Sequence, residues 1–303
     1  MRTFTGEPGM EEIGDGVHAF LQPDGGWCLN NAGLIVSAYG PVLIDTAATR
    51  ARAGLLRELA VKAAGAPPRL IVNTHAHGDH TFGNFVFPEA LVLAHEGTRR
   101  EAARVGLHLT GLWPDVDWGG VELVLPQLTF TGPMTLQLGS HVAELHSFGP
   151  AHSGRDTVVW LPGERVLFTG DLIMSGVTPF VLTGSVRGLR AAVTALRKLD
   201  PLTVVPGHGP VGGPELLDAT ERYLDWLTEL ARTGAAMGLT PLEAARKADR
   251  GAFPGLLDSE RLAPNLHRAY EELRGGSRQP PAEVDMLFAD MVDLHGGLPE
   301  CHA

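Results

Sequence analysis

Short apolar runs bounded by turn residues dominate the first third of the chain. Three of them are rich in aliphatic residues, which predicts strands at residues 17–21, 33–37 and 42–44. Apolar residues then recur at helical spacing, which predicts a helix over residues 49–64 with Gly65 at the position of a C-terminal cap. A buried-looking strand at residues 70–72 follows directly. This order of elements is typical of an α/β fold.

The same alternation of strands and helices returns beyond the middle of the chain. Residues 158–161 and 165–168 read as a hairpin around Pro162-Gly163, and residues 189–196 read as a helix. Residues 202–205 then predict one more strand. The pattern therefore extends the α/β organisation to the segment beyond residue 200.

Three of the predicted strands end in polar, glycine-rich turns, which contain His75, Asp171 and His208. In layered α/β folds, ligands collect outside the carboxyl ends of strands. We therefore expect a functional site where these three turns meet.

From about residue 214 the pattern becomes helical. Apolar residues form a stripe from Leu216 to Leu230, the segment Thr240-Pro241-Leu242-Glu243 has the form of a capping box, and a further helix is predicted over residues 260–274. A Gly- and Pro-rich break at residues 275–281 precedes a last helical segment. We divide the chain into an α/β domain, residues 1–233, and a helical C-terminal extension, residues 234–303, which either lines the site or makes a homodimer contact.

The composition is that of an acidic globular protein. Hydrophobic residues make up 44% and charged residues 19% of the 303 residues, so a sizeable core can form. The sequence shows no signal segment and no long apolar stretch, so a soluble, cytoplasmic protein is expected. The net charge of −11 argues against nonspecific binding to nucleic acids or anionic membranes. The two cysteines, Cys28 and Cys301, are too few for a thiolate metal cage and fit a reducing compartment.

The densest chemical pattern is His75-Ala76-His77-Gly78-Asp79-His80, directly after a predicted strand. Neutral imidazole and carboxylate groups together suit zinc, and also iron or manganese. Alternate residues of a turn point the same way, so His75 and His77 can bind one cation while Asp79 and His80 face a second, about 3.5–4 Å away. The alternative is a surface loop that contains three histidines by chance. Such a loop would not be expected to place ligands for two metal ions at the same time.

This motif resembles the metal-binding motif of the metallo-β-lactamase superfamily, and three later segments resemble the remaining ligand positions of that family. They are Gly149-Pro150-Ala151-His152, Phe168-Thr169-Gly170-Asp171 and Pro206-Gly207-His208-Gly209. Their order and their separations along the chain are also similar to the family pattern. The resemblance covers roughly residues 13–213.

The resemblance implies an α/β fold, a four-layer αβ/βα sandwich with two divalent metal ions at one edge of its sheets. It implies a first site of His75, His77 and His152, a second site of Asp79, His80 and His208, and Asp171 as the bridge between them. Zn²⁺ is the expected metal, with Mn²⁺ and Fe²⁺ as alternatives. Two such cations would lower the pKa of a shared water and polarise a carbonyl oxygen, which is the chemistry of hydrolysis.

Two carboxylates have catalytic roles in this interpretation, and a third has a supporting one. Asp79 is expected to hold the proton of the attacking water, and Asp171 to bridge the metals. An aspartate at position 171, where class B β-lactamases carry a cysteine, favours the thioesterase, glyoxalase II and lactonase branches over antibiotic hydrolysis. Asp45 ends the strand at residues 42–44 and is expected to support the metal loop; capping the following helix is the equally weighted alternative.

Bulky apolar residues in loops around this edge are expected to wall a substrate pocket. They are Trp27, Phe82, Phe85, Trp113, Met174 and Phe180. Segments 25–33, 81–85 and 112–118 are similar to the cyclase/thioesterases of type II aromatic polyketide pathways. That resemblance implies release of an aromatic polyketide, held as a thioester on an acyl carrier protein, with ring closure alongside hydrolysis.

Other functions would keep every metal ligand. A glyoxalase II-like or lactone hydrolase would act on small soluble esters, although a glutathione thioester favours basic side chains near the site, and these are few. An iron-dependent oxidoreductase of the same fold would contain iron and consume oxygen. A nuclease is disfavoured by the acidic charge. Carrier proteins are usually acidic, so docking of one needs a local basic patch, for which Arg99, Arg100 and Arg104 are the candidates.

Overall fold

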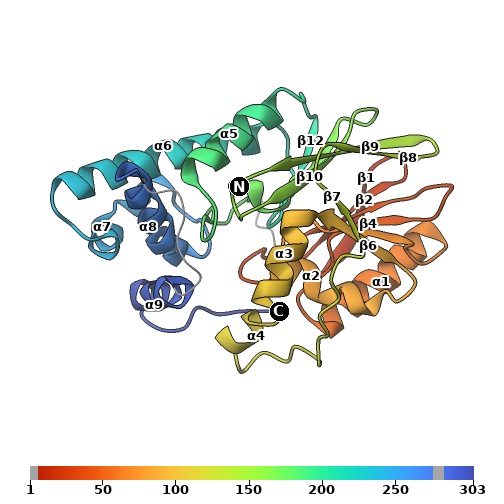
Figure 1. The fold of residues 1–303 in the computed structure, drawn as a ribbon, viewed down its shortest axis with the longest axis horizontal. Coiled ribbons are helices and arrows are strands. Elements are labelled where there is room, and N and C mark those ends of the chain that lie inside the picture. Colours follow the sequence, from red (N-terminus) through yellow and green to blue (C-terminus); the bar gives the residue numbers. More distant parts are fainter. Residues whose placement is uncertain (1–5, 276–282) are drawn as a thin grey trace.

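The strands form two sheets that lie against each other in the computed structural model, which describes residues 6–275 and 283–303 (Figure 1). The first sheet has the order β1-β2-β3-β4-β5-β6-β7, and its strands are Gly9–Gly14, Val17–Leu21, Ala32–Ile35, Val42–Ile44, Leu70–Val72, Leu91–His95 and Leu128–Phe130. Neighbours from β1 to β4 are antiparallel, and neighbours from β4 to β7 are parallel.

The second sheet has the order β12-β11-β10-β9-β8. Its strands, from β8 to β12, are Met134–Leu138, His141–Phe148, Asp156–Leu161, Val166–Phe168 and Thr203–Val205. Only the β11–β12 pair is parallel among these described strands. Strands β5, β11 and β12 all run into turns at the same edge, which is the edge that the sequence pattern indicates for the site.

Helices complete the layers. The α-helices, from α1 to α9, are Arg50–Ala64, Gly78–Thr81, Glu96–Val105, Leu109–Leu112, Val186–Arg197, Glu215–Ala236, Pro241–Lys247, Leu262–Leu273 and Glu283–His295. Short 3-10 helices η1 to η4 are Phe82–Val86, Gly170–Leu172, Arg250–Ala252 and Ser259–Arg261. Helix α1 packs on the first sheet and α5 and α6 on the second, while α7, α8 and α9 gather at one end of the sandwich (Figure 1).

Apolar side chains fill the space between the sheets and the space under each helical layer. Between the sheets, Ile44 and Val72 of the first meet Val159 and Phe168 of the second. Under α1, Leu56 and Ala60 pack on Leu43 and Ile71. Burial of these side chains contributes about 1.5–3 kcal/mol for each large one. The expected four-layer αβ/βα arrangement is therefore confirmed.

The local signals in the sequence correspond closely to the structure. Helix α1 begins after Thr49, whose side chain accepts a hydrogen bond from the Arg52 amide, and it ends at Gly65 in the left-handed conformation. Both hydrogen bonds of the capping box at Thr240 and Glu243 are present. Strands β1 and β6 to β9 have no counterpart among the predicted elements.

The proposed domain boundary at residue 233 falls inside α6, which continues to Ala236. Side chains from both sides of this boundary share one apolar cluster, in which Leu167 and Val193 join Ala244 and Leu266. The division into two domains stays a prediction. Of the predicted break at residues 275–281, all but Gly275 lies outside the described residues.

Candidate metal centre

The turns that follow the strands bring the seven candidate metal ligands together at one edge of the sandwich. His75 and His77 follow β5, Asp79 and His80 lie in α2, and Asp171 lies in η2 after β11. His152 lies between β9 and β10, and His208 follows β12. Their potential ligand atoms fall into two groups, each within 4.8 Å: His75, His77, His152 and Asp171, and then Asp79, His80 and His208.

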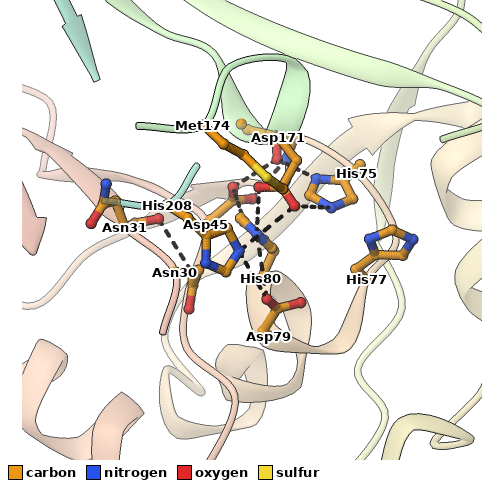
Figure 2. A network of polar contacts seen from close by, with 12 residues as sticks. Asn30, Asn31, Asp45, His75, His77, Asp79, His80, Asp171, Met174 and His208 are labelled. Carbon is orange, nitrogen blue, oxygen red and sulfur yellow. Dashed lines mark hydrogen bonds and ion pairs between the residues drawn. The ribbon is translucent and has the colours of Figure 1, made fainter. Parts of the chain in front are cut away.

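The Asp171 carboxylate lies between these two groups. Its Oδ2 is 3.3 Å from His152 Nε2 and 3.7 Å from His75 Nε2, both in the first group. Its Oδ1 is 3.1 Å from His80 Nε2 of the second group, and Oδ2 is 3.7 Å from His208 Nε2 (Figure 2). One carboxylate thus reaches both groups, as a bridging ligand must.

The remaining donors complete the two groups. Asp79 Oδ2 is 3.2 Å from His208 Nε2 and 3.8 Å from His80 Nε2. His77 Nδ1 lies 3.0 Å from His152 Nε2, so His77 offers its Nδ1 atom where the other histidines offer Nε2. All seven side chains of the predicted ligand set therefore share one site.

Three buried atoms at the centre of this site make no hydrogen bond to any described residue. They are His75 Nε2, His80 Nε2 and Asp171 Oδ1. An unsatisfied buried polar atom costs roughly 1–3 kcal/mol. A cation coordinated by these atoms removes that cost, and nitrogen and carboxylate oxygen donors suit a divalent transition metal. The donor set therefore fits a metal centre.

The outer ring nitrogens of the histidines are held by hydrogen bonds. His152 Nδ1 donates to the Phe180 carbonyl at 2.7 Å, and His208 Nδ1 to the Gly25 carbonyl at 3.0 Å. His80 Nδ1 donates to Asp45 Oδ2 at 2.8 Å. A proton held on the outer nitrogen leaves the lone pair of the inner nitrogen free for a metal, and it also fixes the orientation of the ring.

The electrostatics of the site favour a bound cation. Burial lowers the pKa of His75 well below its ordinary value and lowers the pKa of His152 to about 3, so both rings are neutral, which is the metal-binding form. Burial also opposes a charge on His80. Three carboxylates nevertheless outweigh burial and raise the pKa of His80, those of Asp171, Asp79 and Asp45.

Asp45 supports the metal loop and does not cap a helix. Its Oδ1 accepts the Thr74 amide at 2.7 Å, and its Oδ2 accepts the Thr74 hydroxyl at 2.7 Å. The Thr74 hydroxyl oxygen in turn lies 2.9 Å from His75 Nδ1. Thr49 caps α1 instead. Asp45 thus contacts two of the candidate ligands, His80 directly and His75 through Thr74.

Substitution of Asp45 by asparagine is expected to weaken metal binding roughly 10- to 100-fold. The Asp45 carboxylate accepts hydrogen bonds from the Thr74 amide, the Thr74 hydroxyl and His80 Nδ1. Asparagine has one acceptor oxygen, so it cannot accept all three. Titration against a chromophoric chelator measures the affinity. The matched control is Asp225→Asn, on α6, where Asp225 forms an exposed ion pair with Arg190 of α5, and it should keep the wild-type affinity. Equal affinity in Asp45→Asn would show that the carboxylate is dispensable for ligand positioning.

A largely apolar pocket of about 310 Å³ opens onto the metal centre. Five of the predicted substrate residues line it: Trp27, Phe82, Trp113, Met174 and Phe180. Phe85 does not, so that prediction is wrong: η1 packs along α1, and the Phe85 ring lies against the Arg50 guanidinium at 4.4 Å. Further lining residues come from elements that carry no metal ligand, namely Leu109, Leu112, Arg261, Phe288 and Met291.

Two of the three basic side chains of α3 lie near carboxylates, and the third is held by a backbone carbonyl. Arg100 pairs with Glu96 at 2.5 Å, Arg104 lies 3.8 Å from Glu101, and the Arg99 guanidinium donates to the Pro126 carbonyl. This part of the surface therefore offers a weaker attraction for an acidic carrier protein than its sequence suggests.

None of the helices in the described parts of the chain is both long and apolar enough to span a membrane.

Comparisons with known proteins agree with this geometry. The family model described as Metallo-beta-lactamase superfamily matches residues 25–208. The metallo-beta-lactamase type 2 of Bacteroides fragilis is 26% identical over 233 residues, which cover 73% of this chain and 86% of that protein. The alpha subunit of the 2,4-dinitroanisole O-demethylase of Nocardioides sp. (strain JS1661) is 30% identical over 159 residues, 47% of this chain and 40% of that subunit.

A solved structure shows the same fold. The metallo-beta-lactamase from Pontibacter korlensis matches with a TM-score of 0.60 at 22% sequence identity, covering 72% of this chain and 99% of its own. The family match spans more than half of the chain. The chain therefore belongs to the metallo-beta-lactamase superfamily of metal-dependent hydrolases.

Proposed function

We propose that the protein hydrolyses a thioester with a bulky aromatic acyl group, as the cyclase/thioesterases of type II aromatic polyketide pathways do. The observation that carries this proposal is the pocket, whose aromatic walls open directly onto Asp79, Asp171 and His208. An acyl chain in this pocket would place its carbonyl carbon at the ligand cluster.

In this proposal the ligands, Asp79 and the pocket walls each have a separate role in hydrolysis. Divalent cations, when bound by the seven ligands, supply Lewis acidity and lower the pKa of water. Asp79 lies on the pocket side of the cluster and is placed to accept a proton from the attacking water. A substrate bound between Trp27 and Phe180 would displace water from the site, which would strengthen the electrostatic stabilisation of the developing oxyanion.

The basic side chains near the pocket already lie close to carboxylates, and this disfavours a glutathione thioester, the substrate of the glyoxalase II alternative. Arg261 is paired with Asp258 at 2.8 Å, and Arg104 lies 3.8 Å from Glu101. Recognition of the glutathione carboxylates would call for guanidinium or ammonium groups that are not already paired. An aromatic acyl group needs only the apolar walls. The carrier protein remains a proposed partner.

A second candidate is hydrolysis of an activated aryl ether. The relative from Nocardioides is named for the O-demethylation of 2,4-dinitroanisole, an aromatic ether, and the pocket of this chain is lined by aromatic rings. The same centre could activate water for either reaction.

A substrate panel tests these functions. Purified, metal-loaded protein is expected to hydrolyse a naphthoyl thioester of N-acetylcysteamine and to leave penicillin intact. Rapid hydrolysis of lactoylglutathione without activity on the aryl thioester would select the glyoxalase function. Release of dinitrophenol from 2,4-dinitroanisole alone would select the aryl ether. Metal analysis and an oxygen electrode run in parallel, because bound iron with oxygen uptake would identify an oxidoreductase instead.

A further inference from the structure

Two tryptophans of the pocket wall are each held by a hydrogen bond from the C-terminal part of the chain. Trp27, in the loop between β2 and β3, donates its indole Nε1–H to Glu260 Oε1 at 2.6 Å. Trp113, directly after α4, donates its indole Nε1–H to the Pro299 carbonyl at 2.7 Å. Both indoles are more than nine-tenths buried, so these acceptors satisfy donors that would otherwise be orphaned.

The Trp27 ring is also clamped by a buried cation. The Arg261 guanidinium lies over it, with Cζ 4.1 Å from the ring centroid, and 5.4 Å from the centroid of Phe180. Asp258 fixes this guanidinium at 2.8 Å. A cation–π contact is stronger when the cation is desolvated, as the buried Arg261 guanidinium is. The indole therefore has no freedom to turn out of the pocket wall.

Helix α9 forms another part of the pocket wall, beside Trp113. Phe288 meets Trp113 edge to face, with ring centroids 5.4 Å apart and planes at 84°. Met291 is 1% exposed and lines the same cavity. After α9 the chain returns to end beside α4 (Figure 1), where the Cys301 thiol donates to the Trp27 carbonyl at 3.8 Å.

All of these contacts come from residues beyond the segment that the superfamily matches, which ends at residue 208. We infer that Glu260, Arg261, Phe288, Met291 and Pro299, here called the C-terminal wall, determine the acyl specificity of the enzyme. Phe288 and Met291 are specificity-determining residues that would touch the acyl group. Glu260, Arg261 and Pro299 are positioning residues that act through Trp27 and Trp113. The substrate class is an acyl group with a flat ring system, and this inference rests on the proposed thioester hydrolysis.

Rigidity is the physical reason for this selectivity. Rings that are already immobilised lose no rotamer entropy when a ligand binds, so a flat aromatic group gains the full contact energy. Edge-to-face contacts between rings add to the energy of apolar burial. A small acyl group would leave most of the wall untouched and would gain little from it.

The first test removes one aromatic ring of the C-terminal wall, that of Phe288 on α9. Phe288→Ala is expected to raise KM for the naphthoyl thioester roughly 10-fold or more, while kcat/KM for the acetyl thioester stays within about twofold. Bound metal should not change, because Phe288 is not a ligand. The control on the same helix is Met286→Ala, at a residue that is 47% exposed and outside the pocket, which should behave as wild type.

The second test separates positioning from stability. Glu260→Leu removes the acceptor of the Trp27 indole and should weaken naphthoate binding about 10-fold, whereas Glu260→Gln keeps an acceptor oxygen and should restore it. Calorimetry with naphthoate as the ligand measures this without any turnover.

The two measurements also separate the inference from the proposed function. Binding of naphthoate that is weakened by Phe288→Ala, in a protein that cleaves no thioester, would support the wall and contradict the thioesterase. Equal losses for acetyl and naphthoyl thioesters in Phe288→Ala, or no binding of naphthoate by wild-type protein, would overturn the inference.

Discussion

Replacement of Asp171 by alanine is expected to lower hydrolysis by roughly 10³-fold, since several kcal/mol of transition-state stabilisation depend on the metal centre that it joins. Its two oxygens lie 3.1 to 3.7 Å from the Nε2 atoms of His75, His80, His152 and His208. Removal of the carboxylate takes away the one ligand that both groups share. Metal content after dialysis, measured by mass spectrometry, should fall together with turnover.

The matched control for this variant is Asp218→Ala. Asp218 lies on α6, is half exposed and pairs with Arg197, so its removal should cost less than about 1 kcal/mol of stability and no activity. Circular dichroism checks that both variants keep the fold. Full turnover in Asp171→Ala with metal retained would refute the assignment of Asp171 as the bridge.

Replacement of Gly207 by alanine should disable the same centre without replacing any of the seven candidate ligands. A Cβ atom at this position would come within 1.9 Å of Asp171 Oδ1. Residue 207 cannot retreat, because its amide donates to the Gly170 and Ile173 carbonyls and its carbonyl accepts the Asn31 amide at 2.6 Å. Asp171 must move instead, and a displacement of about 1 Å can lower activity roughly 10²-fold.

The overpacking should also reduce the free energy of unfolding by about 1–3 kcal/mol. Denaturant titration of the metal-free protein measures this change apart from metal binding. Gly163→Ala is the control, because Gly163 lies in the exposed turn between β10 and β11 with no atom within 4 Å of an added Cβ. A fully active Gly207→Ala would mean that the contact with Asp171 is not restrictive.

Much of the centre follows from local sequence signals. His75 to His80 are consecutive, so any turn that ends a buried strand there must bring them together. Asp171 and His208 each follow a predicted strand, and parallel neighbours such as β11 and β12 end at the same edge. The spacing of apolar residues and the positions of glycines were enough to predict these turns, because both signals depend on only a few neighbouring residues.

The sequence identified only part of the pocket wall. Phe82 and Phe85 look equivalent in the sequence, yet only Phe82 lines the pocket, because α1 packs beside η1 and Phe85 faces it. Phe288 and Met291 read as ordinary apolar positions of a helix. Their place in the pocket wall depends on how α9 packs against a segment more than 170 residues away along the chain, at Trp113.

The sequence by itself determined the α/β class, the strand ends and the ligand types, since periodicity and turn chemistry are local properties of the chain. Tertiary structure alone decided that Asp45 serves the metal loop, that Asp171 reaches both groups of ligands, and that the C-terminal wall holds Trp27 and Trp113. Those contacts join segments far apart in the sequence, and their partners are chosen by packing and by the need to satisfy buried polar atoms.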